Sequence, residues 1–229
     1  ATLRFDFTGL GHSEGEFANT NFSSNIEDLI AAADFMRSEF EAPRILVGHS
    51  LGGAAVLAAA AKVPEAQAIA TIGAPSDPGH VAHLVSESRD EIEAKGEAEV
   101  KIAGRTFRIQ KHFLDDIAGH RLADVVGGLK KALLVFHAPR DQTVGIDNAG
   151  EIFAAAKHPK SFVSLDTADH LLSDKADAVY VGAVLAAWAE RYVETATEFT
   201  LPDTADGEVI VAETGEGRFP QLIAAGKHR

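Results

Sequence analysis

The sequence contains no cysteine among its 229 residues. The chain therefore has no thiol with which to form a disulfide, bind zinc or attack a substrate. Basic residues are scarce as well: 21 Lys and Arg face 34 Asp and Glu, and the formal net charge is −13. A surface that tracks the phosphates of nucleic acid or binds an anionic membrane would need the opposite balance. We expect a small molecule or another protein as the partner.

Long apolar runs are also missing. The longest, residues 54–61, is rich in alanine and far shorter than the roughly 20 residues that span a bilayer. The chain opens at Ala1 with no basic segment followed by an apolar one, so we expect no signal peptide and a cytoplasmic location. Because no initiator methionine is present, we also expect the natural start to lie upstream.

Short apolar runs alternate with longer helical patterns along most of the chain. The runs are residues 2–7, 44–48, 68–73, 132–136 and 161–165. Each is rich in Val, Ile, Leu or Phe, as expected of strands that are buried on both faces. The helical patterns cover residues 26–40, 51–62, 148–156 and 174–193. The alternation predicts an α/β fold, a mostly parallel sheet with helices on both faces.

Residues 76–128 break this alternation within a first domain that we assign to residues 1–195. They hold proline, glycine, many charges and two alternating stretches, residues 99–102 and 105–109. Such stretches predict a small hairpin. We expect the interval to be an insertion that forms a cap over the substrate pocket.

The polar segment 196–206 follows and contains Pro202, so it is predicted to be a linker. After it, residues 207–229 carry two apolar stretches that predict two strands. A segment of this length is too short to bury a core of its own. We therefore expect it to be the truncated start of a second domain.

The pattern Gly-x-Ser-x-Gly occurs twice, at residues 11–15 and 48–52. A nucleophilic serine of this pattern needs a strand that runs into it and a helix that leaves directly from it. Ser50 meets both conditions, whereas the polar residues after Ser13 delay the next helix. We predict that Ser50 is the nucleophile and that the backbone N–H of Leu51 forms one half of an oxyanion hole.

A serine nucleophile requires a histidine base and a carboxylate that orients the base. Asp141 follows the predicted strand 132–136, and His170 follows the strand 161–165, in the chain order that this fold requires. Asp166 and Asp169 compete with Asp141, but both lie in the loop of the histidine itself. Asp147 is better suited to cap the following helix.

The other histidines do not fit the role of the base. His49 is set aside as the neighbour of Ser50, which should point away from it, and His137 as too close to the acid. The remaining seven do not follow a later strand of the sheet: His12, His80, His83, His112, His120, His158 and His228.

Two other chemistries have weak signals. Gly9, Gly11 and Gly15 approximate a dinucleotide fingerprint, but the spacing differs and no helix is predicted to open at Gly15. His80 and His83 could bind a metal with Asp77, yet no further ordered ligand is evident. We therefore predict neither a metal nor an organic cofactor.

These motifs resemble the alpha/beta-hydrolase family, in its branch of esterases and serine aminopeptidase-like enzymes. The resemblance lies in GHSLG at residues 48–52, HAPRDQTVG at 137–145 and ADHLL at 168–172, and in residues 6–13, which are similar to the family's D-x-x-G-x-G-x-S turn. It implies a serine hydrolase that cleaves a carboxylic ester or related acyl bond through an acyl-enzyme. Ser50, Asp141 and His170 match the family's catalytic triad.

More narrowly, four segments resemble proteins that fuse such a hydrolase to an OsmC-like domain: residues 4–25, 71–81, 143–149 and 157–173. The tail, residues 207–228, is similar to the first hairpin of that domain. The resemblance implies that three strands and the second oxyanion donor precede residue 2, and it suggests dimerisation through the OsmC-like domain. Such domains use paired cysteines against peroxides, which this chain lacks. The alternative function is a non-catalytic docking module for that domain.

Overall fold

The computed structural model describes residues 1–80, 85–102, 104–193, 209–213 and 221–225. The chain divides into two compact units, residues 1–193 and 194–229. The first unit is an α/β domain, which confirms the predicted fold class.

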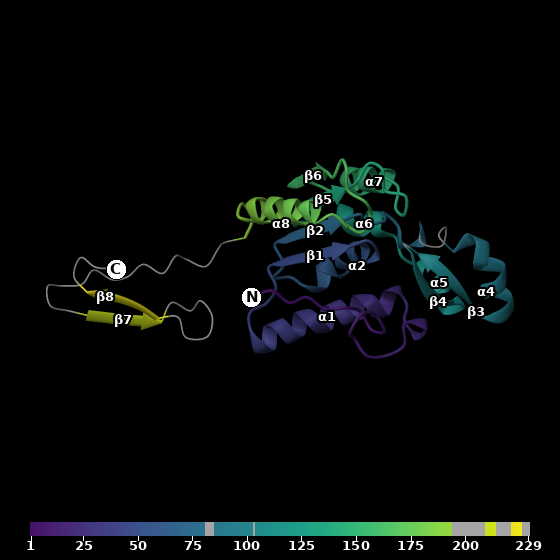
Figure 1. Cartoon of the computed structure of the whole chain (residues 1–229), viewed down its shortest axis with the longest axis horizontal. Coiled ribbons are helices and arrows are strands. Elements are labelled where there is room, and N and C mark those ends of the chain that lie inside the picture. Colours follow the sequence, from purple (N-terminus) through teal and green to yellow (C-terminus); the bar gives the residue numbers. More distant parts are fainter. Residues whose placement is uncertain (81–84, 103, 194–208, 214–220, 226–229) are drawn as a thin grey trace. The chain divides into compact units, whose positions relative to one another are not determined.

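A four-stranded parallel sheet forms the centre of the first unit (Figure 1). Its strands are β1 (Ile45–His49), β2 (Ala68–Ile72), β5 (Ala132–His137) and β6 (Lys160–Ser164), in the order β1-β2-β5-β6. Four of the five predicted strands are thus confirmed to within one residue at either end. Since all four strands run in the same direction, their carboxyl ends meet at one edge of the sheet, where ligands bind in such folds.

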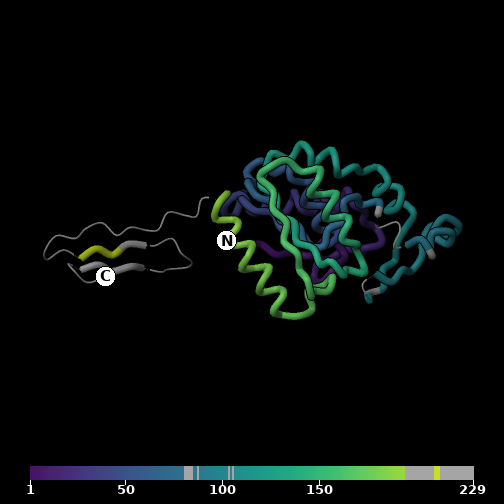
Figure 2. Tube along the Cα trace, turned by 90° about the horizontal axis from the view of Figure 1, so that it is seen from above, coloured from purple at the N-terminus to yellow at the C-terminus, as the bar shows by residue number. Residues whose placement is uncertain are grey.

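Helices of the first unit connect and cover these strands (Figures 1 and 2). The α-helices are α1 (Phe22–Glu39), α2 (Leu51–Ala59), α4 (Arg89–Lys95), α5 (Lys111–Ile117), α6 (Leu122–Gly127), α7 (Asp147–Ala155) and α8 (Lys175–Ala189). Short 3-10 helices are η1 (Phe17–Asn19), η2 (Ala60–Lys62), η3 (Pro78–His80) and η4 (Ser86–Ser88). The four predicted helices correspond to α1, α2, α7 and α8.

The two central strands, β2 and β5, are buried on both faces, which explains why they are continuous apolar runs. Ile69 and Leu133 face the core shared with α1, α2, α6 and α7. Leu134 and Phe136 face the other side, where Trp188 of α8 covers them. Successive side chains of a strand point to opposite faces, so a strand between two layers of helices needs apolar residues throughout.

Residues 2–7 do not form the strand that their composition predicts. They precede the turns at residues 8–12 in an extended segment without ladder pairing to any described strand. Leu3 and Phe5 are exposed. A strand forms only when a neighbouring strand pairs with its backbone. Whether such a neighbour is present depends on the tertiary structure, which local composition does not reveal.

The insertion at residues 76–128 contains the predicted hairpin, formed by β3 (Glu97–Ile102) and β4 (Arg105–Gln110) as an antiparallel pair. Helix α5 is attached to the start of α1, because Asp116 accepts hydrogen bonds from the Ser23 hydroxyl at 2.6 Å and from its N–H at 2.8 Å. The last helix, α6, belongs to the core, since Leu122 and Val126 are buried there. The role of the insertion as a cap stays a prediction.

In the second unit, β7 (Val209–Glu213) and β8 (Gln221–Ala225) form an antiparallel pair with Val211 opposite Ile223. The predicted linker, residues 196–206, lies outside the described residues, and the relation of this unit to OsmC-like domains stays a prediction. Every helix in the described part of the chain is too short or too polar to traverse a lipid bilayer.

Candidate active site

Ser50 occupies a sharp turn between β1 and α2. Its backbone has φ 54° and ψ −128°, a combination that costs a residue with a side chain about 1–3 kcal/mol. The turn is held by the Ser50 N–H, which donates to the Ile72 carbonyl at 2.8 Å, and by the Ser50 carbonyl, which accepts from the Gly53 N–H at 2.9 Å. The serine therefore lies at the carboxyl end of the sheet, at the start of a helix.

Two glycines allow this turn to close. A Cβ at Gly48 would lie 2.2 Å from the Gly52 carbonyl oxygen, and a Cβ at Gly53 would lie 2.6 Å from the Ala74 side chain. Both separations are far below van der Waals contact, so a larger residue would force strand and helix apart. Glycine is thus required at position 48 of the motif and at position 53 just after it, because β1, α2 and the segment after β2 approach each other closely there.

The structure brings the three predicted catalytic residues together. The His170 Nε2 lies 3.0 Å from the Ser50 hydroxyl oxygen, and the His170 Nδ1 lies 2.6 Å from an Asp141 carboxylate oxygen. The side chains of His170 and Asp141 are 7% and 1% exposed. In a neutral His170, Nδ1–H donates to Asp141 and Nε2 accepts from the Ser50 hydroxyl, so the three side chains form one chain of hydrogen bonds.

Asp141 is held as an anion. Burial raises the pKa of its carboxyl group. Hydrogen bonds from His170 and from two backbone N–H groups lower the pKa by more than burial raises it, so the net pKa is below its ordinary value. The two N–H groups belong to Thr143 and Val144 and donate to the second carboxylate oxygen at 2.8 and 2.9 Å. One oxygen of Asp141 is thus used by its own loop and the other by His170.

His137 stabilises the loop that carries Asp141. It is fully buried at the end of β5, and its Nε2–H donates to the Val144 carbonyl at 2.8 Å. Val144 in turn donates its N–H to Asp141. Closeness in sequence to the acid excluded His137 from the site, yet the structure places it as a support of the acid loop.

His49 contacts the base directly, although the sequence argument set it aside. Its Nε2 lies 2.6 Å from the His170 backbone carbonyl, and the two imidazole rings have centroids 4.9 Å apart. The position of His49 directly before the nucleophile could have indicated this contact. The end of β1 lies at the edge of the sheet where the loop that carries His170 also lies.

The alternative carboxylates lie away from the His170 ring nitrogens and have other partners. Asp166 accepts from the Ser164 hydroxyl at 2.5 Å, and Asp169 accepts from the Ser173 N–H at 2.8 Å. Asp147 is the first residue of α7, and the residue at the cap position is Ile146, without a side-chain cap. The proposed capping role of Asp147 is therefore wrong.

The first Gly-x-Ser-x-Gly copy forms a separate turn. The Ser13 hydroxyl donates to the Asp6 carbonyl at 2.5 Å, and no helix leaves directly from Ser13: the short helix η1 begins at Phe17 and α1 at Phe22. Of the pair considered for a metal, His83 and the His80 side chain lie outside the described residues. Across the part of the chain that the structure describes, no group of three or more His, Asp or Glu side chains could hold a metal ion.

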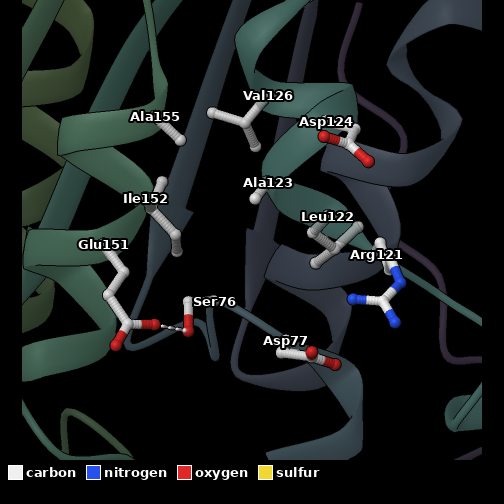
Figure 3. Close-up of a pocket in the computed structure, with 10 residues that line it drawn as sticks. All are labelled: Ser76, Asp77, Arg121, Leu122, Ala123, Asp124, Val126, Glu151, Ile152 and Ala155. Atoms are coloured by element: carbon white, nitrogen blue, oxygen red, sulfur yellow. Dashed lines mark hydrogen bonds between the residues drawn. The ribbon is translucent and has the colours of Figure 1, made fainter.

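A cavity of about 210 Å³ lies between α6, α7 and the segment after β2 (Figure 3). Leu122, Val126 and Ile152 form an apolar wall, and at the rim the Ser76 hydroxyl donates to Glu151 at 2.6 Å. None of the three predicted catalytic residues lines this cavity.

Comparison with known proteins identifies the family. The profile of the serine aminopeptidase (S33) family matches residues 1–81. The crystal structure of the esterase domain of a Rhodothermus marinus protein is 52% identical, with a TM-score of 0.64, and the match covers 78% of this chain and 73% of that domain. The chain belongs to the alpha/beta-hydrolase family.

Mammalian relatives of this alpha/beta-hydrolase are more distant. The mitochondrial palmitoyl-protein thioesterase ABHD10 of Mus musculus is 31% identical over 185 residues, which are 77% of this chain. The chain spans 61% of the length of that relative. The structure of mouse ABHD10 superposes with a TM-score of 0.67 at 25% identity, covering 82% of this chain and 77% of that one.

The turn at Ser50 can be tested through its glycines. Gly48→Ala places a methyl group against the Gly52 carbonyl and should lower the free energy of unfolding by about 1–3 kcal/mol. Gly182→Ala is the matched control, because a Cβ at Gly182 in α8 meets nothing within 4 Å. The control should be neutral or stabilising by up to about 1 kcal/mol. Urea unfolding of both variants measures the difference, and equal stability of the two would contradict the packing argument.

Proposed function

We propose that this protein is a serine hydrolase that cleaves a carboxylic ester or thioester through a covalent acyl-enzyme on Ser50. One observation carries the proposal: the hydrogen-bonded chain from Ser50 through His170 to Asp141. A serine hydroxyl is a weak nucleophile, and this arrangement supplies the base and the carboxylate that activation requires.

In the proposed first step, His170 Nε2 takes the hydroxyl proton as the Ser50 oxygen forms a bond to the acyl carbon. The carbonyl oxygen becomes an oxyanion that faces the start of α2, where the Leu51 N–H is the proposed donor and the helix dipole favours negative charge. The tetrahedral intermediate then collapses. The bond to the leaving group breaks, and His170 gives its proton to the departing oxygen or sulfur.

Hydrolysis of the acyl-enzyme repeats these transfers with water. His170 Nε2 removes a proton from water, the hydroxide oxygen bonds to the acyl carbon, and the Ser50 oxygen leaves and recovers the proton. Asp141 stays ionised throughout, because its hydrogen bonds keep its pKa low. It holds the Nδ1 proton of His170 and stabilises the imidazolium that forms in each half-reaction.

The substrate class follows from the relatives and from the chemistry of the site. One relative is described as an esterase domain and another as a palmitoyl-protein thioesterase. Both leaving groups, an alcohol and a thiol, are served by the same acyl-enzyme mechanism. We therefore propose small-molecule or protein-linked acyl esters and thioesters as the substrates of this site.

Labelling with a fluorophosphonate probe tests the nucleophile. Ser50→Ala should lose both labelling and turnover of a p-nitrophenyl ester, because it removes the hydroxyl that lies 3.0 Å from His170 Nε2. Ser13→Ala is the matched control, since Ser13 lies in the same sequence pattern but donates to the Asp6 carbonyl. It should keep both activities within a few fold. Labelling that persists in the Ser50 variant would refute the assignment.

The acid is tested by replacing carboxylates with amides. Asp141→Asn should lower kcat on the order of 10³-fold or more, because an amide no longer stabilises the imidazolium. Asp169→Asn is the control: this carboxylate adjoins His170 in sequence but accepts from the Ser173 N–H. Its kcat should stay close to that of the wild type. The opposite ranking would place the acid in the histidine loop.

A further inference from the structure

We propose that His49 is a positioning residue that fixes the backbone of His170 relative to Ser50, an inference that rests on the proposed function. The residue lies at the end of β1, directly before the nucleophile. Its Nε2 lies 2.6 Å from the carbonyl oxygen of His170, which is 121 positions away in sequence. A carbonyl only accepts, so the His49 Nε2–H is the donor.

The topology explains why the base loop needs such a support. β1 and β6 are the two outer strands of the sheet, and His170 follows β6. Its loop must therefore cross the ends of β5 and β2 before His170 reaches Ser50 beside β1. Leu171 on this loop is 52% exposed, so the loop lies at the surface there rather than in the core. The hydrogen bond from His49 attaches the far end of the crossing to β1.

The arrangement complements the contacts of the His170 ring. Nδ1 is held by Asp141 and Nε2 contacts the Ser50 hydroxyl, but both contacts act on the side chain. Nε2 must also swing or tilt slightly as it passes a proton between Ser50 and the leaving group. With its backbone carbonyl fixed by the residue adjacent to Ser50, the base keeps its position relative to the nucleophile during that movement.

The protonation state of His49 fits this role. The pKa of His49 is below its ordinary value, mainly because its ring loses contact with water. The hydrogen bond to the His170 carbonyl and the charge of Asp141 raise the pKa, and the charge of His170 lowers it. His170 and Asp141 are thus the titratable groups that act on it. A neutral His49 still carries the Nε2 proton that it donates, and it adds no positive charge beside His170 when His170 becomes an imidazolium.

The size of the effect follows from positioning. Small misplacements of a catalytic group cost rate rather than binding, and a displacement of about 1 Å can lower the rate on the order of 100-fold. Loss of the His49 donor should therefore reduce kcat on the order of 10-fold or more, with KM within about twofold. A purely structural residue would instead lower the melting temperature and the fraction of active protein, without a selective change in kcat per active site.

Two substitutions separate the ring from its hydrogen bond. His49→Phe keeps a flat ring against His170 and removes the donor, whereas His49→Gln keeps an N–H donor on a side chain of similar reach. We expect the Phe variant to lose kcat as above and to react more slowly with a fluorophosphonate, and the Gln variant to recover most of both. Active-site titration normalises kcat, and melting curves report folding.

Lys131→Met is the matched control, because the Lys131 Nζ also donates to a backbone carbonyl, that of Val63 at 2.8 Å, at the start of β5 and so at the opposite edge of the sheet from Ser50. Its kcat should equal that of the wild type. A His49→Phe variant with wild-type kcat would overturn the proposal, as would a Gln variant as impaired as the Phe variant. Wild-type protein that neither turns over esters nor labels with the probe would instead refute the proposed function.

Hydrogen exchange tests the tether without turnover. Amides of residues 166–173 should exchange faster in His49→Phe than in the wild type, because the loop loses its attachment to β1, and His49→Gln should restore protection. Lys131→Met should leave this segment unchanged. Equal exchange in all four proteins would overturn the proposed role of His49 even if the enzyme proved inactive.

Discussion

The backbone turn at Ser50 is the constraint on which the rest of the site depends. Its φ of 54° is unfavourable for a residue with a side chain, and it persists because β2 and α2 hold it by hydrogen bonds on both sides. The same turn requires glycine at positions 48 and 53, where a Cβ would collide with neighbouring atoms. The parallel sheet, with its central strands β2 and β5 buried on both faces, thus fixes the position of a single hydroxyl at the start of a helix.

The other groups reach that hydroxyl because parallel strands end at one edge. Loops after β5 and β6 carry Asp141 and His170, and each loop is bonded by a histidine that is not one of the three predicted catalytic residues. His137 holds the carbonyl of Val144 under the acid, and His49 holds the carbonyl of His170 beside the nucleophile. The site therefore has two layers. The first is the hydrogen-bonded line of Ser50, His170 and Asp141, and the second is His49 and His137, which bond to the backbone of the loops that carry His170 and Asp141.

The sequence predicted the first layer and missed the second. Strand, serine and helix occur in an order that only one Gly-x-Ser-x-Gly copy satisfies, and acid and base follow later strands, so Ser50, Asp141 and His170 could be chosen from local patterns. His49 and His137 bond to backbone carbonyls, which every residue has, so no residue type at the far end marks the contact. The failure at residues 2–7 has a similar cause, because alternating Leu3 and Phe5 are compatible with a strand but do not supply its neighbour.

A pre-steady-state measurement tests the central claim, a covalent acyl-enzyme on Ser50, most directly. The protein is mixed with an excess of a p-nitrophenyl ester, quenched with acid within the first turnovers, digested and examined by mass spectrometry. The account predicts a burst of p-nitrophenol no larger than the concentration of active sites, together with an acyl group on the peptide that contains Ser50. A burst without an acylated peptide would contradict it, as would an acyl group on any residue other than Ser50.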